Sequence, residues 1–282
     1  MALNDILLHI DTYPEATPGP MIDAAVRLGA TFGGTIAALA TEVTFPVKSN
    51  RVADFLIGLG ALAQEEVARS RKCGEAALAH FTAAARKAGV FQSASAETAF
   101  LYDIADRVAL RARTRDLCIV PLAERFDGQQ DVAQAVVFGS GRPALVIGPT
   151  SAPPPEGGLG LVVVAWDGTR AAARAMADAL PILVQARAVH ILTVVNEKAA
   201  ATAGLGLEAV RHLTLHGAAA SAREVDAGGD SIGEVLDRYL KDEGAEMLVM
   251  GAYGHSRLRE FILGGATDHM LRAPPVPVFM SH

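Results

Sequence analysis

Charged residues are scarce in this chain, and it has no basic cluster of the kind that binds nucleic acid. Only 20% of the 282 residues are charged and 51% are hydrophobic, so the chain can fill one or two packed cores and shows little sign of disorder. The 31 acidic residues outnumber the 25 basic ones, and no window gathers Lys and Arg as a nucleic-acid surface does. We therefore expect no nucleic-acid partner.

Segments for export and for membrane insertion are also lacking. Residues 1–5 have neither the basic nor the apolar region of a signal peptide. No uninterrupted apolar stretch approaches the roughly 18 residues that a membrane span requires. These absences predict a soluble, cytoplasmic protein with no membrane partner. Cys73 and Cys118 form no C-x-x-C motif and give no disulfide framework.

The sequence contains no motif of the common catalytic classes. It has neither a Walker A lysine motif nor a G-x-S-x-G elbow. His212 and His216 lie four residues apart on an expected helix, but the Glu of H-E-x-x-H is missing, so a solvated helix face explains them better than a metal site. We expect no metal ligands and no catalytic residues, and at most slow ATP hydrolysis.

What the chain does contain is a weak internal repeat. Each half opens with an apolar run that ends at an aspartate, Asp11 in the first and Asp167 in the second, and each closes with a proline-led apolar run, at 143–147 and 275–279. The proline- and glycine-rich stretch 151–158 between them is typical of a linker. The repeat predicts two domains, residues 1–150 and 157–282.

Short apolar runs alternate with helical patterns in both halves. Strands are expected near 5–10, 33–40, 91–95, 116–120 and 144–148, and again near 160–166, 188–195, 221–226, 246–250 and 276–280. Helices are expected near 169–183, 205–216, 230–243 and 265–272, and a long one is expected in 50–87. Strands that alternate with helices predict an α/β fold of two tandem, doubly wound parallel sheets.

The most informative glycines stand near the C-terminal end. The apolar run 247–250 leads into Gly251 and Gly254, and a second pair, Gly264 and Gly265, follows just before an expected helix. Glycines allow a backbone to approach a ligand closely, and the free N–H groups at a helix start favour an anion. The pattern predicts a phosphate-binding loop.

The spacing Gly251-x2-Gly254-x9-Gly264 resembles the nucleotide-binding signature of the universal stress protein family. The resemblance implies an adenine nucleotide alpha hydrolase-like fold with strand order 3-2-1-4-5 and ATP, with or without Mg²⁺, as the ligand. It also implies these nucleotide-contacting positions: Ala165, Trp166, Asp167, Val194, Val195, Met250, Gly251, Gly254, Gly264, Gly265, Ala266 and Thr267. Gly265 departs from the family pattern, which usually has Ser or Thr there, and so removes one expected phosphate contact.

The first half lacks the signature. Pro121 stands where Gly251 stands in the second half, and Val132 and Ala133 stand where Gly264 and Gly265 do. Proline has no N–H to donate, and the two side chains would occupy the space of phosphate oxygens. We expect no nucleotide in this half.

These observations favour a tandem universal stress protein that binds ATP in its second domain and acts in stress adaptation or signalling with little catalysis. The alternative is a nucleotide-free interaction module of the same fold. An adenylyl-transferring enzyme of the wider group is a third and weaker hypothesis. The last strands of the two halves are expected to pair inside the chain as a pseudo-dimer, and a homodimer stays open.

Overall fold

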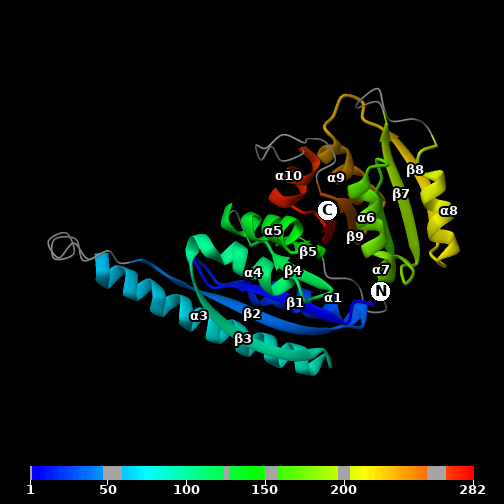
Figure 1. Ribbon diagram of the computed structural model, residues 1–282. Coiled ribbons are helices and arrows are strands. Elements are labelled where there is room, and N and C mark those ends of the chain that lie inside the picture. Colours follow the sequence, from blue (N-terminus) through cyan, green and yellow to red (C-terminus); the bar gives the residue numbers. More distant parts are fainter. Residues whose placement is uncertain are drawn as a thin grey trace.

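The computed structural model describes residues 2–46, 59–123, 127–149, 151, 158–195, 204–252 and 265–282. Ten strands form one continuous sheet in the order β3-β2-β1-β4-β5-β10-β9-β6-β7-β8, and helices cover both of its faces (Figure 1). The first five strands come from the N-terminal half of the chain and the last five from the C-terminal half. Each half has the predicted order 3-2-1-4-5, and the α/β fold class is confirmed.

The N-terminal half contains the longest elements of the chain. In chain order they are β1 Asp5–Asp11, α1 Gly19–Phe32, β2 Thr35–Thr44, α3 Leu59–Lys87, β3 Phe91–Phe100, the 3-10 turn Leu101–Asp103, α4 Ile104–Ala112, β4 Leu117–Pro121, α5 Asp127–Gly139 and β5 Ala144–Ile147. Residues 50–58 of the expected long helix lie outside the described residues. The remainder, α3, runs beneath β2 and β3 and extends with them away from the other elements (Figure 1).

The C-terminal half repeats the plan with shorter elements. They are β6 Leu161–Ala165, α6 Arg170–Asp178, α7 Leu180–Leu183, β7 Ala188–Val195, α8 Leu207–Leu215, β8 Ala220–Asp226, α9 Ile232–Asp242, β9 Met247–Gly251, α10 Gly265–Arg272 and β10 Val278–Ser281. The single helix expected over 169–183 is wrong, because the chain forms two helices there. Pro181 lies in the first turn of α7. Proline has no backbone N–H to donate to the preceding helical turn, and its ring clashes with the carbonyl there, so a continuous helix is interrupted at this point.

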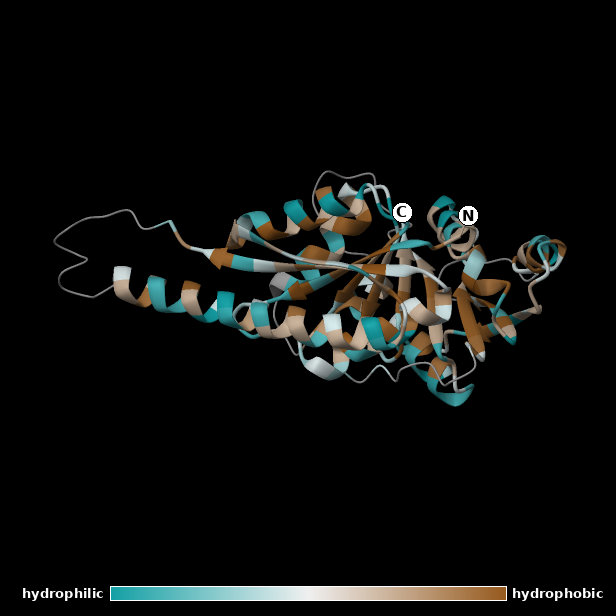
Figure 2. Ribbon diagram, turned by 90° about the horizontal axis from the view of Figure 1, so that it is seen from below, coloured by the Kyte–Doolittle hydropathy of each residue, from teal (hydrophilic) through white to brown (hydrophobic). Residues whose placement is uncertain are grey.

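Two hydrophobic cores, one on each face of the sheet, run through both halves. On one face α1, α3, α6 and α8 contribute buried residues such as Phe81 and Leu213, and on the other α4, α5, α9 and α10 contribute residues such as Val136 and Met270. Hydrophobic residues are concentrated in the strands, and hydrophilic residues line the outer faces of the helices (Figure 2). The central strands β4 and β9 are apolar along almost their whole length because both of their faces are covered.

The two halves meet through β5 and β10, which pair antiparallel in an otherwise parallel sheet. Leu145 lies opposite Phe279, and both side chains are fully buried. These two residues occupy the same place in their halves, since Leu145 is the partner of Ile119 on β4 and Phe279 is the partner of Val249 on β9. A local two-fold axis therefore passes through this pair and relates the two half-sheets.

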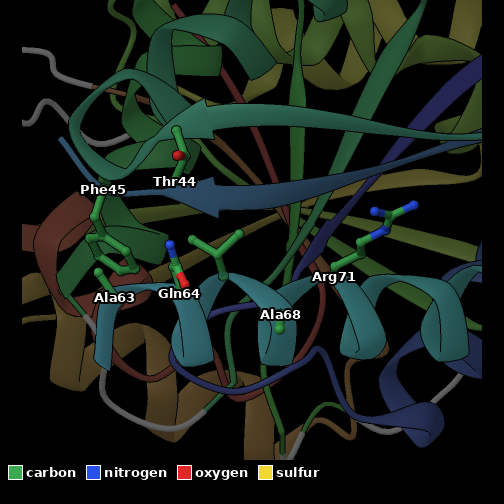
Figure 3. Close-up of a pocket in the computed structure, with 7 residues that line it drawn as sticks. Thr44, Phe45, Ala63, Gln64, Ala68 and Arg71 are labelled. Atoms are coloured by element: carbon green, nitrogen blue, oxygen red, sulfur yellow. The ribbon is translucent and has the colours of Figure 1, made fainter. Parts of the chain in front are cut away.

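Among the helices that the structure describes, none has both the length and the apolar character needed to cross a membrane. A groove of about 410 Å³ lies between the end of β2 and the first turns of α3 (Figure 3). It is lined by Thr44, Phe45, Ala63, Gln64, Val67, Ala68 and Arg71. The groove belongs to the protruding end of the N-terminal half and contains none of the predicted site residues.

Candidate functional site

The winding of the C-terminal sheet reverses at β6. This strand pairs with β7 on one side and with β9 on the other, both in parallel register. The chain leaves β6 through α6 on one face of the sheet and leaves β9 towards α10 on the opposite face. Connections that diverge in this way leave a crevice at the carboxyl ends of the two strands, which is where ligands bind in such sheets.

The predicted residues of β6 and β9 meet at this crevice. Ala165 lies opposite Met250 in the register, so Trp166, Asp167 and Gly251 follow directly at adjacent strand ends. Val194 and Val195 end the next strand, β7, and both are half-buried. The structure thus brings together seven of the predicted positions at one edge of the sheet.

Asp167 has a structural role that is fully visible. Its Oδ1 accepts hydrogen bonds from the backbone N–H and the hydroxyl of Thr169, at 2.9 and 2.7 Å. Thr169 is the N-cap of α6 and accepts from the N–H of Ala172. Because the Asp167 side chain is exposed, its Oδ2 can also accept from a hydroxyl group of a ligand in the crevice.

Trp166 anchors a neighbouring segment. Its indole Nε1 donates to the backbone oxygen of Leu205 at 3.2 Å, and its backbone N–H donates to Leu192 on β7. The Leu205 side chain lies next to Gly168, where a Cβ atom would be 3.2 Å from Leu205 Cδ1. Gly168 has a positive φ of 73°, which glycine adopts readily. No local pattern could predict the contact with Leu205, because this residue lies far from Trp166 along the chain.

Gly251 is required for packing, which the sequence could not reveal. A Cβ atom at this position would lie 2.5 Å from the backbone carbon of Ala171 and 2.5 Å from the backbone nitrogen of Ala172. The end of β9 therefore touches the first turn of α6. The expected close approach exists, but a helix backbone occupies the space that a ligand was expected to fill.

The start of α10 is open by contrast. Gly265 is exposed, and a Cβ atom there would meet no other atom within 4 Å. Ala266 is half-buried, and Thr267 is almost fully buried. Gly254 and Gly264 lie outside the described residues, so the expected phosphate loop itself is not placed.

The helix α10 is held firmly against α9. His269 Nε2 lies 2.6 Å from Asp237 Oδ2, and the imidazole ring covers Gly233 so closely that a Cβ there would lie 2.4 Å from the ring. This contact fixes the helix that follows the glycine loop. No group of three or more His, Cys, Asp or Glu side chains that could hold a metal ion occurs in the part of the chain that the structure describes.

In the N-terminal half the equivalent crevice is filled by side chains of the protein. Asp11 is the last residue of β1 and stands at the register position of Asp167, which lies two residues beyond β6, but Asp11 is only 7% exposed. The fully buried His9 ring lies with Nε2 3.0 Å from Thr41 Oγ1 and 3.7 Å from Asp11 Oδ1, and Gln129 on α5 hydrogen-bonds the Asp11 carboxyl. Sequence reasoning did not identify His9, Thr41 and Gln129, because only the parallel register brings these residues together.

Burial dominates the electrostatics of this filled crevice. It raises the pKa of the Asp11 carboxyl, while the His9 ring and the Gln129 hydrogen bond oppose the change. Burial lowers the pKa of the His9 ring, against the opposing charge of Asp11. Both groups are therefore driven towards their neutral forms.

Comparison with known proteins matches this architecture to one family. The model of the universal stress protein family matches residues 160–282. The universal stress protein Slr1230 of Synechocystis is 42% identical over 45 residues, a match that spans 16% of this chain and 16% of that protein.

Solved structures extend the match in fold to the whole chain. A universal stress protein from Archaeoglobus fulgidus superposes with a TM-score of 0.63 at 14% identity, covering 98% of this chain and 97% of the other. A candidate universal stress protein from Pseudomonas aeruginosa gives a TM-score of 0.53 at 18% identity, covering 99% and 93%. Residues 160–282 therefore match the universal stress protein family, and the chain as a whole shares the fold of these solved universal stress proteins.

Proposed function

We propose that this protein binds ATP in the crevice of its C-terminal half and acts as a nucleotide-responsive stress protein with little or no catalysis. The observation that carries the proposal is the contrast between the two crevices. At the same register position, Asp167 is exposed whereas Asp11 is buried among its own neighbours, and the C-terminal half also has an open helix start at Gly265. Among the residues that the structure describes, the aspartate of the C-terminal crevice is the one accessible to a ligand.

The residues of the C-terminal crevice suit an adenine nucleotide in part. Asp167 Oδ2 would accept from a ribose hydroxyl, and the half-buried Val194 and Val195 would contact the base. The first turn of α10, whose first residue Gly265 is exposed, would direct N–H groups at a phosphate. Mg²⁺ would be bound through the phosphates of ATP. The phosphates would also supply the negative charge that a helix N-terminus favours.

Thermal unfolding with and without Mg-ATP tests the proposal. A ligand that binds only the folded state adds RT ln(1 + [L]/Kd) to the free energy of unfolding, about 2.7 kcal/mol when its concentration is a hundred times Kd. We expect Asp167→Asn to reduce the stabilisation by ATP, since the amide keeps the Thr169 contacts but loses the charged acceptor. The matched variant Asp11→Asn should leave the stabilisation by ATP unchanged. No stabilisation of the wild-type protein at millimolar ATP would overturn the proposal.

A nucleotide-free interaction module is the second candidate. It is favoured by the helix backbone that fills the space beside Gly251 and by the missing hydroxyl at Gly265. Mass spectrometry of the small molecules released when the purified protein is denatured separates the two candidates. Adenine nucleotide in that extract supports ATP binding, and its absence together with a null thermal shift supports the interaction module.

A further inference from the structure

The outer edge of the N-terminal half-sheet is a long strand without a strand partner. β3 is the first strand in the sheet order and pairs only with β2 among the described elements. Its ten residues include a run from Gln92 to Ala96 whose side chains are exposed to solvent, even though α3 runs beneath the strand. Because β3 pairs only with β2 among the described strands, the N–H and C=O groups of every second residue on its outer side can hydrogen-bond to another strand.

Features that normally protect an edge strand are scarce on β3. The strand has no Pro, Lys or Arg, and its one charged residue is Glu97. That carboxylate is held on the α4 side by Arg107 and Arg111, at 2.9 and 3.0 Å. The register shift against β2 is confined to its first residues, so the strand is regular from Ser93 to Phe100. A regular, uncharged edge favours pairing with another strand.

The opposite edge of the same sheet is shorter and more highly charged. β8 has seven residues, and three of them carry charge: Arg223, Glu224 and Asp226. Charged residues on a short edge strand oppose edge-to-edge association. The chain therefore protects one of its two edges and leaves the other suited to a partner.

We propose that β3 pairs antiparallel with β3 of a second copy of this chain, forming a two-fold symmetric dimer with one continuous sheet. The sequence of the exposed run supports a copy of itself as the occupant. With the axis at Ala94, Ser93 of each copy lies opposite Ser95 of the other, and no like charges face each other, since Glu97 lies opposite Phe91. Such an isologous contact is the commonest arrangement in soluble oligomers.

The chain already uses the same operation internally. β5 and β10 join the half-sheets antiparallel about a local two-fold axis, and that pairing consumes the other edge of each half. Among the described strands, β3 is thus the remaining unprotected edge. Its distance from β6 and β9 in the sheet order keeps the dimer contact apart from the candidate nucleotide crevice.

Sedimentation of the intact protein over a wide concentration range tests the dimer. We expect the wild-type protein to sediment with twice the chain mass of 29.4 kDa. The double variant Ala94→Lys, Ala96→Lys should sediment as a monomer, because lysines of the two copies would face each other across the axis. The matched control Ala94→Thr, Ala96→Thr should stay dimeric, since threonine suits an exposed strand and adds no charge.

Two further readouts keep the test decisive. Hydrogen exchange should be slower at the β3 amides of the wild-type protein than at those of the lysine variant, while the β8 amides exchange equally in both. Equal melting temperatures at low concentration would show that the lysine variant is folded. A wild-type protein that is monomeric throughout, or a folded lysine variant that stays dimeric, would overturn the proposal.

Discussion

Asp11 and Asp167 occupy the same register position in the two halves but lie in opposite environments. The residue four positions before each aspartate pairs with the fourth strand of its half. Leu7 pairs with Cys118 on β4, and Val163 pairs with Leu248 on β9. The neighbours of the two aspartates differ. His9 and Thr41 enclose Asp11, whereas Ala165 and Val194 stand at their places beside Asp167. The residues at these two strand positions, together with Gln129 of α5, therefore distinguish the filled crevice from the accessible one.

The buried carboxyl predicts a pH dependence of stability. Because burial raises the pKa of Asp11 above its ordinary value of 3.8, the folded protein holds this proton more tightly than the unfolded chain. The stability contributed by Asp11 is thus complete below that ordinary pKa and is lost as pH rises through the folded-state pKa. We expect Asp11→Asn to become progressively more stable relative to the wild-type protein as pH rises.

Urea unfolding of both proteins between about pH 4 and 8 measures this difference. The pKa of His9 is lowered by burial, so His9 destabilises both proteins as pH falls below its ordinary value of 6.5. Above that value the His9 ring is neutral in the folded and unfolded states, so its effect cancels in the comparison. A difference for Asp11→Asn that does not change with pH would contradict the raised pKa of the Asp11 carboxyl.

The two glycines that flank the crevice should respond oppositely to alanine. Gly251→Ala should lower the free energy of unfolding by about 1–3 kcal/mol, because the new methyl group would collide with the α6 backbone. Gly265→Ala should change stability by less than about 1 kcal/mol, in the stabilising direction, since it fills open space at a helix start. Denaturant unfolding without nucleotide measures both, and equal effects would contradict the packing role assigned to Gly251.

The sequence identified the residues of the crevice better than their roles. The apolar run 247–250 and the glycine after it are local signals, so the strand end could be predicted. Whether Gly251 contacts a ligand or a helix depends on where Ala171 lies in space, and no local pattern contains that information. The capping contact of Asp167 with Thr169 was foreseeable as an alternative because both residues stand in one turn.

At the scale of elements, the order and type of strands followed from the alternation of apolar runs and helical patterns. The predicted strands near 116–120 and 246–250 agree with β4 and β9 within a residue. The lengths of β2 and β3 did not follow, because both extend past their apolar residues to accompany α3. Pro181 marks the break between α6 and α7. It stands within an apolar run that continues the helical pattern, so the pattern predicted a single helix.

The pairing of β5 with β10 makes each strand dependent on the other. Residues 157–282 expressed alone would expose the edge of β10, including Phe279, which is fully buried in the whole chain. Since an apolar edge is unstable in water unless it is paired, we expect this fragment to self-associate through β10. Sedimentation that showed a monomeric, well-folded fragment would contradict this expectation. A fragment carrying Phe279→Lys, folded but monomeric, would place the contact on β10.

At the scale of the whole molecule, the chain joins two copies of one fold to which we assign separate tasks. The local two-fold axis at Leu145 and Phe279 makes the halves symmetric in topology, and the glycine and aspartate environments make them asymmetric in chemistry. The N-terminal half offers a filled crevice and a free edge strand. The C-terminal half offers an accessible crevice and a charged edge.

The number of nucleotides bound per chain tests this division of tasks most directly. Equilibrium dialysis of the intact protein against labelled ATP with Mg²⁺ measures it without reference to stability. We predict saturation at one nucleotide per chain, with affinity that falls in Asp167→Asn and is unchanged in Asp11→Asn. Saturation at two nucleotides per chain, or no binding at millimolar ATP, would contradict the account.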